Sequence, residues 1–186
     1  MTLDNLNTVA AELEKQELQA QGGVSSPLLY TKLLAIYLYQ NDLCNAKFLW
    51  KRIPSSVKAG HPELELVWSV GRAMWKRDAP AVFTALNGTQ WSENVGPIMR
   101  SLVGKVRERG LRLVAQAYSS LSIDTCSSLL GLSPSEVVEF ANQQGWGVDD
   151  NKMMISPVRP PPPITHITSS EDQLHKLTDF VAFLEN

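Results

Sequence analysis

CSSLLGLSPSEVVEFANQQGWGVDD, residues 126–150, holds two short helical patterns, a break between them and a hairpin pattern after them. Asp124 lies at the start of the first pattern and is expected to cap that helix, because its carboxylate can accept the free N–H groups of the first turn. Gly131 is expected to end the helix, since glycine takes the left-handed conformation without steric cost. The second pattern therefore follows a tight turn.

Ser133-Pro134-Ser135-Glu136 begins the second helix. It is a capping box with proline at the first helical position, and the helix is expected to run to Gly145. Trp146–Val148 and Met153–Ile155 flank the turn Asp149-Asp150-Asn151, so they predict a small β-hairpin. The order helix, turn, helix, hairpin is that of a winged helix.

Many winged helices bind DNA, but the charges of this one do not suit a duplex. From Ser122 to Asp150 there is no lysine or arginine, and there are five acidic residues, Asp124, Glu136, Glu139, Asp149 and Asp150. Because affinity for duplex DNA comes chiefly from basic side chains that neutralise phosphates, we expect no nucleic-acid partner and a unit that contacts protein.

A basic run lies just before this unit. Lys105, Arg109 and Arg112 can share one helix face, which leaves a nucleic-acid binding module as the alternative function. A salt titration with duplex DNA distinguishes a nucleic-acid binding module from a unit that contacts protein, because binding to phosphates weakens steeply with salt.

Two helical hairpins precede the winged-helix pattern. Helices are expected over 3–21, 27–40, 42–53, 62–77 and 78–86. The pair 27–53 can be laid over the pair 62–86 with an offset of 36 residues, which places Leu38 on Met74, Tyr39 on Trp75 and Trp50 on Leu86. This period is typical of stacked helix-pair repeats of the tetratricopeptide kind.

Residues 92–121 predict one or two further helices. A break is expected near Gly104 or Gly110, because glycine inside a helix costs about 1 kcal/mol relative to alanine. The expected buried stripe consists of Met99, Leu102, Val103, Val106, Leu113, Val114, Ala117 and Leu121.

The composition is that of a globular protein without an obvious catalytic centre. Net charge is −2, and the two cysteines, Cys44 and Cys126, lie in apolar helical patterns where both are expected to be buried. No pair of the three histidines has metal-ligand spacing, and no phosphate-binding glycine loop or nucleophile elbow occurs. We therefore expect no enzyme activity, metal or cofactor.

The first 20 residues contain four acidic residues and no apolar run long enough for a leader peptide or a membrane span. We therefore expect an intracellular protein without a membrane partner.

The C-terminal part combines a stiff linker with an amphipathic helix. PVRPPPP, residues 157–163, is expected to be an extended spacer. Ser170 then begins a helix with apolar side chains at heptad spacing and two more beside them: Leu174, Leu177, Val181 and Leu184, with Phe180 and Phe183. A helix this short is marginal alone in water, so it is expected to enter a helical bundle made by other chains, with packing onto its own chain as the alternative.

This order of parts resembles that of PCI-type scaffold subunits, which occur in the proteasome lid, in the initiation factor three complex and in the COP-nine signalosome. Six strings narrow the resemblance to a small signalosome subunit: NAKFLWKRIP (45–54), WSVGRAMWKRD (68–78), QWSENVGPIM (90–99), AQAYSSL (115–121), LLGL with GW (129–132, 145–146) and LTDFVAFLEN (177–186).

The resemblance implies a mainly α fold in four parts: a helical-repeat region (1–91), a winged-helix region (92–156), a proline-rich linker (157–170) and a C-terminal bundle helix (171–186). It implies a non-catalytic subunit that supports cullin deneddylation, and so the regulation of cullin-RING ubiquitin ligases, in the cytoplasm and nucleus. A scaffold subunit of the proteasome lid or of initiation factor three is the alternative within the same class. The resemblance also implies that the metalloprotease lies in another subunit. The third, PCI-type subunit is implied to contact the winged helix, for which the candidate residues are Trp146, Val148, Met153 and Ile155, and the terminal helix is implied to join a shared bundle.

Overall fold

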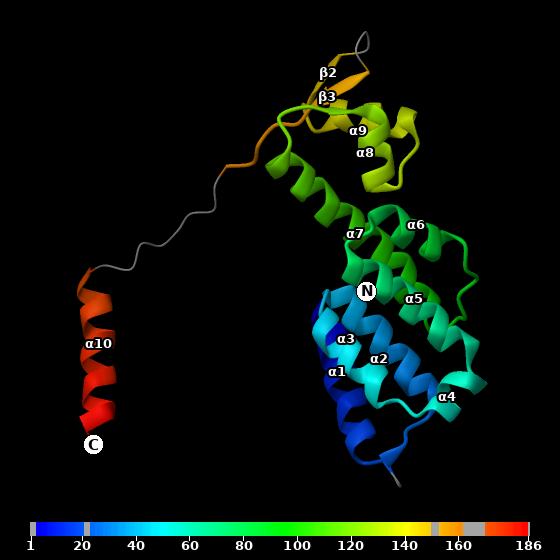
Figure 1. Cartoon of the computed structure of the whole chain (residues 1–186), viewed down its shortest axis with the longest axis vertical. Coiled ribbons are helices and arrows are strands. Elements are labelled where there is room, and N and C mark those ends of the chain that lie inside the picture. Colours follow the sequence, from blue (N-terminus) through cyan, green and yellow to red (C-terminus); the bar gives the residue numbers. More distant parts are fainter. Residues whose placement is uncertain (1–2, 21–22, 150–152, 162–169, 186) are drawn as a thin grey trace.

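The computed structural model describes residues 3–20, 23–149, 153–161 and 170–185, and it is mainly α-helical, as predicted (Figure 1). Its helices are α1 Leu3–Leu18, α2 Pro27–Gln40, α3 Leu43–Arg52, α4 Ser55–Gly60, α5 Pro62–Lys76, α6 Ala79–Asn87, α7 Gly96–Ala117, α8 Ile123–Leu130, α9 Pro134–Gln143 and α10 Ser170–Glu185. Its strands are β1 Leu121–Ser122, β2 Gly147–Asp149 and β3 Met154–Ser156. The short helix α4 was not predicted.

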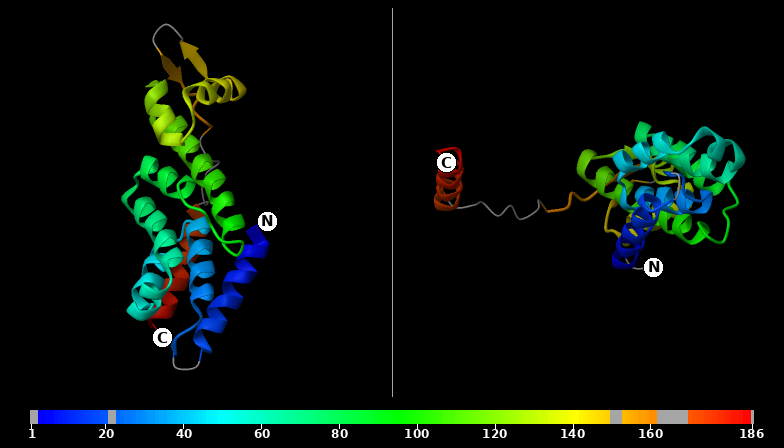
Figure 2. Two further views of the ribbon diagram at one scale, coloured as in Figure 1. Left: turned by 90° about the vertical axis from the view of Figure 1, so that its right-hand side faces the viewer. Right: turned by 90° about the horizontal axis from the view of Figure 1, so that it is seen from below.

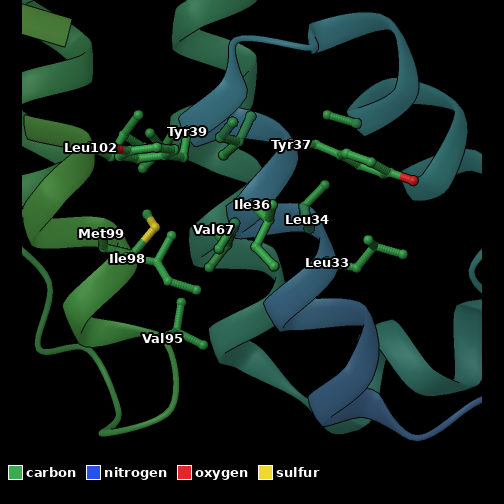
Figure 3. Packing of buried hydrophobic residues seen from close by; sticks show 14 of the residues in the cluster. Leu33, Leu34, Ile36, Tyr37, Tyr39, Val67, Val95, Ile98, Met99 and Leu102 are labelled. Atoms are coloured by element: carbon green, nitrogen blue, oxygen red, sulfur yellow. The ribbon is translucent and has the colours of Figure 1, made fainter. Parts of the chain in front are cut away.

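Helix α2 lies at the centre of the N-terminal part. Every side chain from Leu33 to Tyr39 is buried, so the helix is covered on all sides. It contacts α1, α3, α5 and α7. Figure 3 shows the α2 side chains beside Val67 of α5 and beside Ile98, Met99 and Leu102 of α7. Burial of this continuous apolar surface is the main force that holds the N-terminal helices together.

The two predicted helix pairs, α2 with α3 and α5 with α6, are present and pack on each other through α2 and α5. Their second helices begin alike. Asp42 and Asp78 accept the N–H groups of Asn45 and Ala81 at 3.0 and 3.1 Å, and the residue before each aspartate is left-handed. These features recur at the predicted offset of 36 residues, while assignment to a repeat class stays a prediction.

Helix α7 is continuous for 22 residues, so the predicted break at Gly104 or Gly110 is wrong. Packing explains the difference for Gly110, where an added Cβ would lie 3.2 Å from the side chain of Leu130 in α8. Favourable tertiary contacts offset the cost of glycine in the helix. The prediction of the buried stripe is wrong at its C-terminal end. Leu113 and Ala117 are exposed, and Leu111 packs against the core instead.

The C-terminal unit contains α8, α9 and a three-stranded antiparallel sheet in the order β1-β3-β2. The hairpin of β2 and β3 and the capping box at Ser133 are as predicted. Strand β1 was not predicted, and Ser122 rather than Asp124 caps α8, through its hydroxyl and the Thr125 N–H. Residues 150 and 151 of the expected turn lie outside the described residues, and the winged-helix class stays a prediction.

Loss of the capping box should weaken α9 measurably. The Ser133 hydroxyl accepts the Glu136 N–H at 3.4 Å. The Ser133 N–H and hydroxyl each donate to the Glu136 carboxylate at 2.7 Å, and these bonds lower the pKa of that carboxyl. Alanine removes both hydroxyl bonds. We expect Ser133→Ala to reduce the free energy of unfolding by about 1 kcal/mol, the usual effect of losing an N-cap. Urea denaturation measures it. Ser120→Ala, at an exposed serine outside any helix start, is the control and should change stability by less than half as much.

Two hydrophobic cores meet along α7. Its first half, with Ile98, Met99 and Leu102, belongs to the N-terminal core, and its second half, with Val114 and Ala115, belongs to the C-terminal core. The change from one core to the other therefore falls within α7, C-terminal to the predicted boundary at residue 92.

Polar and aromatic contacts stabilise the junction between the two cores. The Arg107 guanidinium donates to the carbonyl oxygens of Leu130 and Gly131 at 3.2 and 3.3 Å. It also lies 5.9 Å from the ring centre of Phe83 in α6. One side chain thus links α6, α7 and the end of α8.

Helix α10 stands apart from the remaining helices in Figure 1 and in the right-hand view of Figure 2. Of the predicted proline-rich linker, residues 157–161 are described, and residues 162–169 lie outside the described part. Within the described ranges, no helix combines the length and hydrophobicity needed to span a membrane.

Candidate protein-interaction surfaces

Helix α10 presents all six of its predicted interface residues to solvent. Their exposed fractions are 67% for Leu174, 62% for Leu177, 67% for Phe180, 51% for Val181, 77% for Phe183 and 78% for Leu184. The heptad residues follow one another along one side of the helix, and the two phenylalanines extend the apolar surface around it. None of its described side chains is buried.

A soluble protein seldom leaves so continuous an apolar surface uncovered without a reason. The helix is 16 residues long, and isolated helices of this length are marginal in water. One ion pair within the helix is long, with His175 Nε2 3.9 Å from a carboxylate oxygen of Asp179. Stability of α10 must therefore come from packing against another surface.

In the C-terminal unit, the four predicted interface residues do not share one surface. Ile155 is fully buried and Trp146 is 8% exposed, with its ring edge-on to Phe140 at 5.9 Å between centroids. Both belong to the core of this unit, so their inclusion as contact residues is corrected. Val148, paired with Ile155 across the hairpin, is half-buried, and Met153 is 56% exposed.

The three basic residues of α7 that were expected to share a face, Lys105, Arg109 and Arg112, do not form a free cationic face. Lys105 and Arg112 lie 2.9 and 3.6 Å from the carboxylate oxygens of Glu108. The Arg109 side chain is partly buried, its Nε donates to the Lys105 carbonyl oxygen at 3.2 Å, and burial lowers the pKa of its guanidinium. In α9, Glu136 and Glu139 are exposed. This arrangement disfavours the nucleic-acid alternative.

The sequence profile of the CSN8/PSMD8/EIF3K family matches residues 24–164, from just before α2 to just beyond the C-terminal sheet. The chain belongs to this family. The predicted resemblance to a signalosome subunit is thereby confirmed at the level of the family.

Several similar proteins of the CSN8/PSMD8/EIF3K family have the same name. COP9 signalosome complex subunit 8 of Danio rerio is 44% identical over 175 residues, which cover 94% of this chain and 92% of that protein. The proteins of the same name from Drosophila melanogaster and Dictyostelium discoideum are 33% and 29% identical, covering 100% and 97% of this chain and 100% and 92% of their own lengths. The predicted resemblance to a small signalosome subunit is confirmed.

The two cysteines lie in different surroundings. Cys126 is buried, which raises the pKa of its thiol, whereas Cys44 is exposed and its predicted burial is wrong. Cys44 lies on the outer side of α3, opposite the core residues Ala46 and Leu49. In the described part of the chain, no three potential metal ligands cluster. His166 lies outside the described residues.

Sequence reasoning missed a surface of α3, α4 and α5. There Trp50 stacks on Trp68, and lysines lie over the rings of Trp50 and Trp75. These residues come from three helices, so their proximity depends on tertiary packing. One signal of this surface was present in the sequence: three of the chain's five tryptophans lie between residues 50 and 75.

Proposed function

We propose that this chain is a non-catalytic structural subunit of the COP9 signalosome and acts through contacts with other proteins. The observation that carries the proposal is α10, whose apolar side chains are between 51% and 78% exposed. Relatives that match the chain over nearly its whole length are named as subunit 8 of that complex. A subunit with an uncovered amphipathic helix at one end is suited to hold polypeptides together.

The contacts divide between two parts of the chain. We propose that α10 enters a helical bundle shared by several subunits, with Leu177 and Val181 at its centre. The C-terminal unit contacts the third, PCI-type subunit through a surface that includes Met153 and Val148. Through these contacts the chain supports cullin deneddylation by a different subunit, and so the regulation of cullin-RING ligases, in the cytoplasm and nucleus.

Native purification tests this proposal. The chain is tagged at its N-terminus, purified gently from its source cells, and its partners are identified and quantified by mass spectrometry. Other signalosome subunits are expected in amounts close to equimolar with the chain. Recovery of the chain alone, or with subunits of the proteasome lid or initiation factor three in place of signalosome subunits, would overturn the proposal.

A further inference from the structure

The outer surface of α3, α4 and α5 has a charge opposite to that of the whole protein. Between Leu43 and Arg77 there are seven basic side chains and two acidic ones, a net charge of +5, whereas the chain as a whole carries −2. The basic residues are Lys47, Lys51, Arg52, Lys58, Arg72, Lys76 and Arg77. We call this region the α3–α5 surface. Its charge favours an acidic partner.

Two lysines of the α3–α5 surface are positioned by tryptophan rings. Lys58 Nζ lies 4.7 Å from the ring centre of Trp50, which stacks on Trp68 at 5.3 Å with an interplanar angle of 10°. Lys47 Nζ lies 4.2 Å from the ring centre of Trp75. These cation–π contacts restrict the side chains, while the ammonium groups keep N–H donors for a carboxylate.

Neither lysine is neutralised within the described part of the chain. No carboxylate there forms an ion pair with Lys47 or Lys58, whereas Arg52 is held by Glu17 at 2.6 Å. Of the two acidic residues in the segment, Glu63 already accepts the Ser92 N–H at 2.8 Å. The α3–α5 surface thus offers fixed ammonium groups whose charge has no partner from its own fold.

Exposed apolar side chains accompany these charges. Phe48, next to Lys47 in α3, is 60% exposed, and Trp75 is 46% exposed. The outer side of α3 faces away from α2, as Leu49 and Ala46 on its inner side are buried. A partner that fits must bring apolar groups as well as negative charge.

These observations favour a peptide over a nucleic acid. Single-stranded nucleic acids bind by stacking bases on free aromatic faces. Here Trp50 is already in contact with Trp68 and Lys58, and Trp75 with Lys47, so the rings serve to hold cations. A carboxylate on each ammonium group, with an apolar side chain on Phe48, uses the two lysines that the rings position and the exposed ring that follows Lys47 in α3.

We propose that the α3–α5 surface binds an acidic segment of a partner protein, with carboxylates on Lys47 and Lys58 and an apolar side chain on Phe48. The surface lies on elements other than α10 and the hairpin of β2 and β3, so this contact is compatible with both contacts proposed above. It does not depend on them, because its evidence comes from the N-terminal helices alone.

Fluorescence anisotropy with the full-length chain tests this inference. The probe is a fluorescein-labelled peptide of glutamates interspersed with leucine and phenylalanine, at low ionic strength. Lys47→Gln with Lys58→Gln is expected to weaken binding about five- to tenfold, the effect of losing two well-placed ion pairs. The control variant, Lys15→Gln with Lys105→Gln, removes the same charge outside the α3–α5 surface and should weaken peptide binding less than twofold. Circular dichroism checks that both variants are folded.

Further probes identify the occupant. A peptide of equal charge with serine in place of leucine and phenylalanine should bind more weakly than the original, and equal binding would overturn the apolar contact. The inference is also overturned if the acidic peptide does not bind, or if both double variants weaken it equally. Tighter binding by a single-stranded DNA of the same charge, or by a peptide of residues 170–185, would instead assign the surface to nucleic acid or to α10 of a second copy.

Discussion

Replacing Gly131 by alanine is expected to lower the free energy of unfolding by about 3 kcal/mol, through backbone strain and overpacking together. Gly131 has φ +61°, a conformation that side chains disfavour. A Cβ at this position would lie 2.4 Å from Cγ of Phe83 in α6, so α6 and the end of α8 would have to separate. The substitution therefore disturbs the junction between the two cores as well as one turn.

Thermal unfolding measures this effect, with an expected fall in Tm of about 6–12 °C for a chain of this size. Gly145→Ala is a matched control, because Gly145 has φ +68° and an added Cβ would meet nothing within 4 Å. The control should lose only about 1–2 kcal/mol, the cost of the left-handed backbone. Equal losses for the two variants would show that the contact with Phe83 does not hold the junction.

Replacing Leu177 and Val181 by aspartate is expected to abolish assembly of the chain with its partner subunits while the isolated chain stays folded. Both side chains are more than half exposed in α10, so the change removes no packing from either core. In a bundle, each aspartate would place a charge among apolar side chains, at a cost that the contact cannot offset. Co-purification of coexpressed subunits measures assembly, and thermal unfolding of the isolated variant measures its fold.

A second double variant controls for the added charge. His175→Asp with Ala182→Asp places the same two aspartates on the polar side of α10, away from the heptad seam, and should leave assembly largely intact. If both variants assemble like the unaltered chain, α10 is not the assembly helix. If both fail, the seam has no special role.

Local sequence signals predicted helix boundaries well where a side chain caps its own helix. Asp42, Asp78 and Ser133 accept backbone N–H groups within three residues, so the relevant chemistry is contained in the sequence itself. Strand β1 was missed because two residues carry no pattern, and it forms by pairing with β3, where Leu121 lies opposite Ile155 and Ser122 opposite Met154. Its formation also explains why Ser122, and not Asp124, caps α8, which begins at Ile123.

Predictions of exposure were less successful. The alternation of apolar residues in the hairpin does not tell which side a core will cover, so Trp146 and Ile155 were taken for contact residues although both are buried. In α10 the prediction of an apolar face needed only helical periodicity. The α3–α5 surface was missed because the stack of Trp50 on Trp68 joins residues of two helices, and only packing determines that contact.

The most direct test of the central claim is hydrogen–deuterium exchange of α10 in the isolated chain and in the purified complex. If other subunits cover its apolar face, the amides of α10 should exchange almost freely in the isolated chain and orders of magnitude more slowly in the complex. Protection of α10 in the isolated chain equal to that of α2, with no change on assembly, would show that the helix is covered by its own chain and would contradict the account.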